Sequence, residues 1–74
     1  MEKSYVYFAK GQVPDGYFGD FATVDFYYDP ASGKTIVNHK SGHFAYGTPP
    51  ADSVQEAMYL LKNHPASNAR FVTA

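Results

Sequence analysis

The chain has no cysteine and no tryptophan, and it is poor in aliphatic side chains. Without cysteine, disulfides and thiolate zinc sites are excluded, although many domains of this size depend on one or the other. Ile36 is the only isoleucine, and Leu60 and Leu61 are the only leucines. We therefore expect side-chain packing, alone or helped by self-association, to supply the stability.

Neither acidic nor basic residues predominate, and long apolar runs are missing. Six basic and seven acidic residues are interspersed and give a formal net charge of −1, whereas binding to duplex nucleic acid normally requires a basic patch. No apolar run reaches the roughly 18 residues of a membrane-spanning helix. Residues 1–4 lead into a Tyr-rich segment that is unlike the apolar region of a signal peptide. These features predict a cytoplasmic protein that does not enter a membrane.

Aromatic residues replace the missing aliphatic ones, with seven Tyr and six Phe in 74 residues. Each can bury about 150–250 Å², and aromatic and β-branched residues favour strands. The length predicts one compact domain, residues 1–74. Its predicted class is α+β.

Runs of such residues predict a mainly antiparallel sheet of three to five strands. The strands are expected at residues 4–9, 20–28, 34–39, 43–46 and 69–73. Residues 11–19, with the turn signature Pro14-Asp15-Gly16, are expected to form a long loop. The second to fourth strands follow one another through short turns, which favours a β-meander. The pairing of the last strand is left open.

One amphipathic helix is predicted between residue 52 or 53 and residue 64. Ser53 and Glu56 have the spacing of a capping box, and Asp52 with Gln55 is the alternative. Pro65 disfavours helix at the residue before it. Four residues at helical spacing are expected to face the sheet: Val54, Ala57, Met58 and Leu61. The element order is therefore β-β-β-(β)-α-β.

A single short helix can cover only one face of this sheet. We assign to the covered face Val6, Phe8, Val24, Phe26, Tyr28, Ile36 and either Phe71 or Val72. The opposite face then holds Tyr5, Tyr7, Phe21, Thr23, Asp25, Tyr27, Thr35 and, as a further candidate, His39. Exposed aromatic patches tend to be interaction sites, but cross-strand aromatic pairs also stabilise sheets without any ligand.

The predicted partner-binding residues are therefore aromatic. The primary set is Tyr5, Tyr7, Phe21 and Tyr27, and the secondary set, expected in loops, is Tyr17, Phe18, Phe44 and Tyr46. A protein partner is favoured over nucleic acid, because Asp25 lies on this face and the chain has a single Arg. Association of two such faces in a homodimer is the other alternative.

Three patterns that resemble sites have simpler interpretations. Ser32-Gly33-Lys34-Thr35 matches the end of a P-loop, but Tyr28 stands where that motif needs Gly, so a β-turn is favoured. His39 and His43 lack an evident third metal ligand. The aspartates at 15, 20, 25 and 29 fall in turns or on the wet strand face. We predict no catalytic residues, no cofactor and no metal.

The favoured function is a small non-enzymatic binding module that acts through a protein–protein interface, as an inhibitor, adaptor or accessory subunit. An origin in a phage or mobile element, with a host machine as target, fits the size of the chain. The first alternative is binding of nucleotides or single-stranded nucleic acid by aromatic stacking on the sheet. The second is a homodimeric structural domain.

Overall fold

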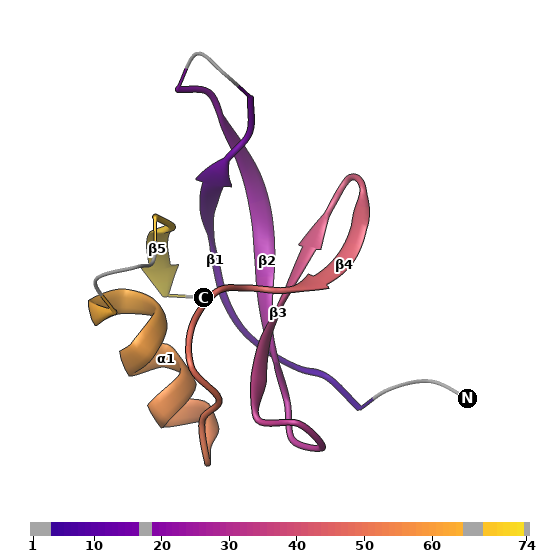
Figure 1. Cartoon of the computed structure of the whole chain (residues 1–74), viewed down its shortest axis with the longest axis vertical. Coiled ribbons are helices and arrows are strands. Elements are labelled where there is room, and N and C mark those ends of the chain that lie inside the picture. Colours follow the sequence, from indigo (N-terminus) through magenta and orange to yellow (C-terminus); the bar gives the residue numbers. More distant parts are fainter. Residues whose placement is uncertain (1–3, 17–18, 65–67, 74) are drawn as a thin grey trace.

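The computed structural model of the protein describes residues 4–16, 19–64 and 68–73. Of residues 71–73 it describes the backbone alone. In these residues, five strands and one helix follow one another in the order β-β-β-β-α-β (Figure 1). Their bounds are β1 Val6–Pro14, β2 Phe21–Asp29, β3 Lys34–His39, β4 Gly42–Ala45, α1 Val54–Asn63 and β5 Arg70–Thr73.

The five strands form one antiparallel sheet with the spatial order β4-β3-β2-β1-β5. The first four strands are a β-meander, so the predicted α+β fold class is confirmed. The position of β5, which the sequence left open, is beside β1, where it pairs with residues 9–12. The helix lies against β1, β3 and β5 (Figure 1). We call the sheet face under α1 the helix face and the opposite one the outer face.

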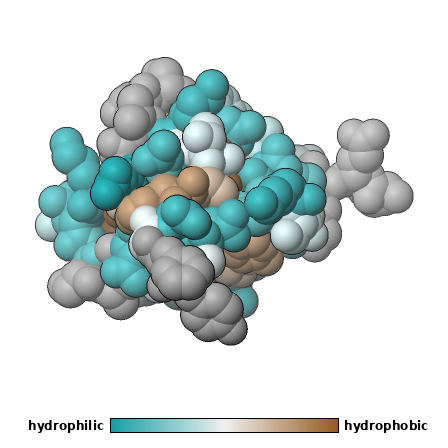
Figure 2. Space-filling view, turned by 90° about the horizontal axis from the view of Figure 1, so that it is seen from above, coloured by the Kyte–Doolittle hydropathy of each residue, from teal (hydrophilic) through white to brown (hydrophobic). Residues whose placement is uncertain are grey.

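Alternation in β2 places the core as the sequence predicts. Val24, Phe26 and Tyr28 are buried on the helix face, where Ala57 and Leu61 of α1 join them. Val54 and Met58 pack partly buried against this core, which confirms the predicted inner side of the helix. On the surface seen from above (Figure 2), hydrophobic residues show in the middle of the view and hydrophilic ones border them.

The segment that joins β4 to α1 runs back across the sheet (Figure 1) and is fixed to it by buried hydrogen bonds. The Tyr28 hydroxyl donates to the Ala51 carbonyl at 2.8 Å, and the Ala51 amide donates to the Gly33 carbonyl at 2.6 Å. Tyr46 lies edge-on to Phe26, with ring centroids 5.9 Å apart. These contacts hold the start of α1 against the helix face.

Strand β1 is longer than predicted, because it includes residue 10 and residues 11–14 of the expected loop. A bulge interrupts its pairing with β2 between Tyr7 and Ala9. The extra residue lets Phe8 and Ala9 both be buried, which breaks the simple alternation expected from the sequence. Gly11 follows, and a Cβ there would meet the Arg70 carbonyl, so this position allows β5 to approach β1.

The predicted face assignment of β3 is wrong by one residue. Thr35 pairs with Tyr28 and is 1% exposed on the helix face, whereas Ile36 pairs with Tyr27 on the outer face. Two β-branched residues in succession, Ile36 and Val37, left the alternation ambiguous. Burial of Thr35 is tolerated because its hydroxyl accepts a hydrogen bond from the Thr48 hydroxyl at 3.3 Å.

One further face assignment is corrected. His39 shares the side of Val37, so it lies on the helix face, not the outer face. Val6 pairs with Tyr28 on the helix face, as predicted, but it is 41% exposed at the start of β1. The alternatives for Phe71 and Val72 concern side chains outside the described part of the chain.

Ser53 is the N-cap of α1, in agreement with the first of the two predicted alternatives. Its hydroxyl accepts a hydrogen bond from the Glu56 amide at 3.2 Å, and the Glu56 carboxylate accepts one from the Asp52 amide at 2.9 Å.

Ser53→Ala should therefore lower the free energy of unfolding by about 1 kcal/mol in urea denaturation. Asp52→Ala is the matched control and should lower the free energy of unfolding by less than Ser53→Ala does. A larger loss for Asp52→Ala than for Ser53→Ala would contradict Ser53 as the N-cap.

Gly33 and Gly19 offer a matched test of the crossing segment, because their φ angles are +73° and +78°. A Cβ at Gly33 would lie 2.6 Å from the Ala51 carbonyl oxygen, whereas Gly19 has nothing within 4 Å. Gly19→Ala should cost about 1 kcal/mol from left-handed backbone strain alone. Gly33→Ala should cost at least about 1 kcal/mol more, because it displaces a buried hydrogen bond. Equal losses in thermal unfolding would show that Ala51 does not dock there.

Candidate aromatic interaction site

Three of the four primary candidates meet on the outer face. The Tyr27 ring of β2 lies 5.5 Å from the Tyr7 ring and 6.4 Å from the Tyr5 ring, measured between centroids. His43 of β4, which the sequence did not select, completes the group at 5.9 Å from Tyr5 and 6.4 Å from Tyr27. We call these four residues the aromatic cluster. Its tilted and edge-to-face geometries are those that aromatic pairs prefer.

The cluster requires the chain before β1 to cross the sheet. Tyr5 precedes β1, yet its ring reaches His43 on β4, three strands away in the sheet order. Figure 1 shows this part of the chain passing from the start of β1 toward the side of the molecule that carries the β3–β4 hairpin. The rings of Tyr5, Tyr27 and His43 therefore form a triangle that spans β3, with each ring in contact with the other two.

Ile36 is the β3 residue beneath this arrangement. It lies between Tyr27 and Ala45 in the strand register and is only 6% exposed, although it is not part of the main hydrophobic core. An isoleucine on the face without a helix is buried only if other side chains cover it. The aromatic cluster thus encloses a second, small apolar site, and part of the outer face is covered by the chain itself.

Tyr7 and His43 are the exposed members of the cluster, while Tyr5 and Tyr27 are half-buried. Tyr7 is 44% exposed, and β5 pairs only with residues 9–12, so among the described residues no strand lies along the free edge of β1 beside it. The side chain of Tyr7 offers another molecule an apolar ring with a polar tip, and the strand edge beside it offers backbone groups that an extended peptide can pair with.

Phe21, the fourth primary candidate, lies on the same face but at the other end of β2. Six residues separate it from Tyr27, which is roughly 20 Å along a strand. The Arg70 guanidinium covers its ring, with the Arg70 Cζ atom 4.0 Å from the ring centroid. Lys10 and Asp25 are register partners between the two ends. The structure thus separates Phe21 from the aromatic cluster.

The two secondary candidates that the structure describes, Phe44 and Tyr46, do not join this surface. Phe44 is exposed, but it pairs with Val37 and so belongs to the helix face, 6.1 Å from the His39 ring. Tyr46 is half-buried against the core. Tyr17 and Phe18 lie outside the described residues.

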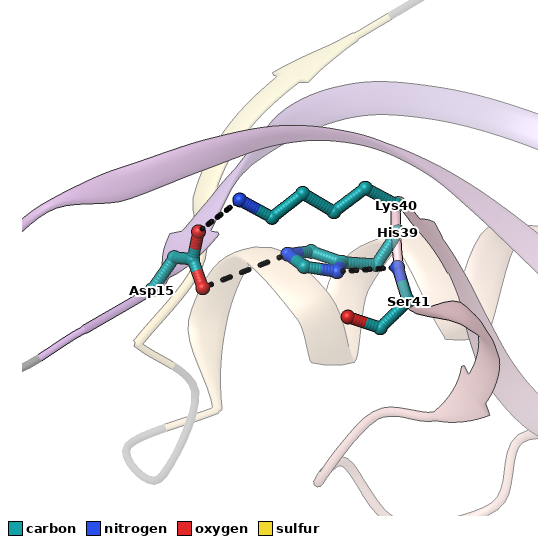
Figure 3. A network of polar contacts seen from close by, with 4 residues as sticks. All are labelled: Asp15, His39, Lys40 and Ser41. Atoms are coloured by element: carbon teal, nitrogen blue, oxygen red, sulfur yellow. Dashed lines mark hydrogen bonds and ion pairs between the residues drawn. The ribbon is translucent and has the colours of Figure 1, made fainter.

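A polar group on the helix face connects the β3–β4 turn to the end of β1 (Figure 3). Asp15 lies 3.3 Å from the Lys40 ammonium and 3.9 Å from His39 Nε2, and His39 Nδ1 accepts a hydrogen bond from the Ser41 amide at 3.1 Å. The Nδ1 lone pair is thus occupied, and Nε2 is directed at a carboxylate. His39 thus links the β3–β4 turn to Asp15, which follows β1.

The other patterns that resemble sites are also accounted for by local structure. The Asp29 carboxylate accepts hydrogen bonds from the Ala31 amide and the Ser32 hydroxyl, and Gly33 has positive φ, so residues 29–33 form a turn. His39 and His43 point to opposite faces of their hairpin. Across the described residues, no three His, Asp or Glu side chains gather as a set of metal ligands.

Compared with protein-family models, curated proteins and solved structures, the chain matches none of them. The described part of the chain contains no helix with the length and hydropathy needed to cross a bilayer.

Ile36 and Val6 allow a direct test of the second apolar site, since the sequence predicted both in the core. Ile36→Ala should lower the free energy of unfolding by about 2–4 kcal/mol, because it empties a covered apolar position. Val6→Ala should cost less than about 1 kcal/mol, since its side chain is already 41% exposed. A loss for Ile36→Ala no larger than that for Val6→Ala would mean that the aromatic cluster does not cover Ile36.

Proposed function

We propose that this protein is a small non-enzymatic binding module that acts through a protein–protein interface on its outer face. Tyr7 and His43 form the accessible centre of that interface, with Tyr27 and Tyr5 beside them. The observation that carries the proposal is the aromatic cluster on the sheet face that no helix covers.

The chemistry of this surface favours a protein as partner. Tyrosine is enriched at protein interfaces because it supplies a large rigid contact area with a polar tip. The edge of β1 beside Tyr7, along which no described strand lies, adds backbone donors and acceptors that an extended peptide can pair with. An inhibitor, an adaptor or an accessory subunit of a larger assembly would each work through such a surface, and a phage- or mobile-element-encoded inhibitor of a host machine is one form of this proposal.

Single-stranded nucleic acid is the second candidate, favoured by Arg70 over Phe21 and by Lys10 on the same face. Arginine planes and aromatic rings both stack with bases. Tyrosine fluorescence titrated with mixed oligonucleotides at low and high salt distinguishes the two candidates. A change at low salt that disappears at high salt would favour nucleic acid over a protein partner.

Tyr7 and Tyr59 provide a matched pair for the main test, because both are exposed tyrosines, at 44% and 65%, on different surfaces. Immobilised wild-type protein, Tyr7→Ala and Tyr59→Ala should be incubated with lysate of the source cells, and the captured proteins identified by mass spectrometry. We expect a partner that binds wild type and Tyr59→Ala equally and that Tyr7→Ala loses at least tenfold.

Equal capture by all three proteins would place the interface elsewhere. Molar mass from light scattering identifies a second copy of the chain as the partner if wild type and Tyr59→Ala are dimers and Tyr7→Ala is a monomer. Capture of nothing by a monomeric wild type would contradict the proposal.

A further inference from the structure

Strand β4 is one edge of the sheet and is open on the side away from β3. In the described part of the chain it pairs with β3 alone, and all four of its residues, Gly42–Ala45, are exposed. The helix packs against β1, β3 and β5, and in Figure 1 the β3–β4 hairpin stands on the other side of the molecule from α1. The backbone groups on the open side of β4 are therefore accessible to another chain.

Two residues of β4 direct their backbone groups to this open side. The Tyr46 amide donates to the Thr35 carbonyl at 2.8 Å, so the residue after β4 faces β3 through its backbone. In an antiparallel ladder the residues that face the neighbouring strand alternate. Phe44 therefore also faces β3, whereas His43 and Ala45 each present one amide and one carbonyl to the open side.

The residues of β4 do not oppose pairing with another chain. Natural edge strands are commonly protected by charged side chains, a proline or a bulge. The sequence Gly-His-Phe-Ala contains no acidic residue, lysine, arginine or proline, and its register with β3 is regular. Because β4 has only four residues, the pairing it can form is short. It is flanked by an apolar group, since the Phe44 side chain is 44% exposed.

We infer that β4 is the contact between two copies of the chain, which pair through this strand about a two-fold axis at Phe44. In this register His43 of each copy lies opposite Ala45 of the other. All the outward-directed backbone groups are then bonded, and the two strands share four hydrogen bonds. A shift of two residues in either direction leaves one of the two residues in each copy unpaired. The two five-stranded sheets join into one.

The side chains favour a second copy over an unrelated peptide. Phe44 lies opposite Phe44 of the other copy as a pair without hydrogen bonds, which has the closer cross-strand spacing, about 4.5 Å between Cα atoms. Each exposed ring is therefore covered by the other. The nearest charged residue along the chain is Lys40. In this register the two Lys40 residues lie at opposite ends of the paired strands, so like charges stay apart.

This contact does not rest on the function proposed above. It uses the edge of β4 and the helix face beside it, whereas the proposed interface is centred on Tyr7 and His43 on the outer face. His43 takes part in both, through its backbone in the dimer and through its side chain in the aromatic cluster. A two-fold axis at Phe44 is perpendicular to the sheet, so the outer faces of both copies lie on the same side of the joined sheet.

The test follows molar mass and amide NMR signals of the full chain at rising concentration. For wild type we expect the mass to rise from the 8.2 kDa of one chain to twice that value between about 10 µM and 1 mM, a range that suits an interface at the small end of the size scale. The amide signals of His43 and Ala45 should shift together with the mass. The Tyr46 amide, which is already bonded within the chain, should shift less.

Phe44→Lys and Phe44→Glu test the register, because residue 44 meets residue 44 of the other copy only if the axis passes there. Each variant alone places two like charges opposite each other and should remain a monomer at about 1 mM. An equimolar mixture should form a heterodimer, since the opposed charges then have opposite sign. Tyr7→Ala and Tyr59→Lys, which change exposed residues away from β4, should dimerise as wild type does.

A wild type that stays a monomer at about 1 mM would overturn the inference, as would a dimer in which the His43 and Ala45 amides do not shift. Dimerisation of either charged variant alone, or failure of the folded variants to associate when mixed, would also overturn it. If a variant does not fold, the wild-type mass and amide signals decide. A dimer that Tyr7→Ala abolishes would place the contact on the outer face and contradict pairing through β4. A β4 dimer without any captured partner would sustain this inference and contradict the proposed function.

Discussion

The ten residues of α1 are set against a sheet of five strands, so a helix can shield only one of the two sheet faces. On that face the buried side chains of β2 and β3 meet Ala57 and Leu61, and residues 46–53 cross the sheet to bring the helix into position. The outer face has to be stabilised by other means. The chain does this with aromatic rings, the side chains it has in excess.

The outer face is consequently divided into three parts. At one end the aromatic cluster covers Ile36, in the middle Lys10 and Asp25 are register partners, and at the other end Arg70 lies over Phe21. Each aromatic group thus has an intramolecular partner. The Tyr–Tyr contacts therefore contribute to stability whether or not another molecule binds, and the part that remains accessible is centred on Tyr7 and His43.

Local sequence patterns predicted most of the fold. The strict alternation in residues 21–28, the Ser53–Glu56 spacing and the turn residues at 29–33 each depend on contacts within a few residues, and the structure has all three as expected. The face of Ile36 and the exposure of Val6 were not predictable in this way. The face of Ile36 is set by the register in which β2 pairs with β3, Tyr28 with Thr35 and Tyr27 with Ile36, and Val6 is exposed although it pairs with the buried Tyr28. From the sequence, His43 stands out only as a candidate metal ligand, because an isolated histidine beside a turn gives no signal of an aromatic neighbour.

The crossing of the sheet by Tyr5 is central to the outer face, because the shape of the aromatic cluster and its cover over Ile36 both depend on it. Nuclear Overhauser contacts between the Tyr5 and His43 rings, whose centroids are 5.9 Å apart, measure it directly. The Phe26 and Tyr46 rings, also 5.9 Å apart but in the core, provide the internal reference. We predict that both contacts are present in water and that the Tyr5–His43 contact is lost at a lower urea concentration. Absence of the Tyr5–His43 contact in water, with the Phe26–Tyr46 contact intact, would contradict the account.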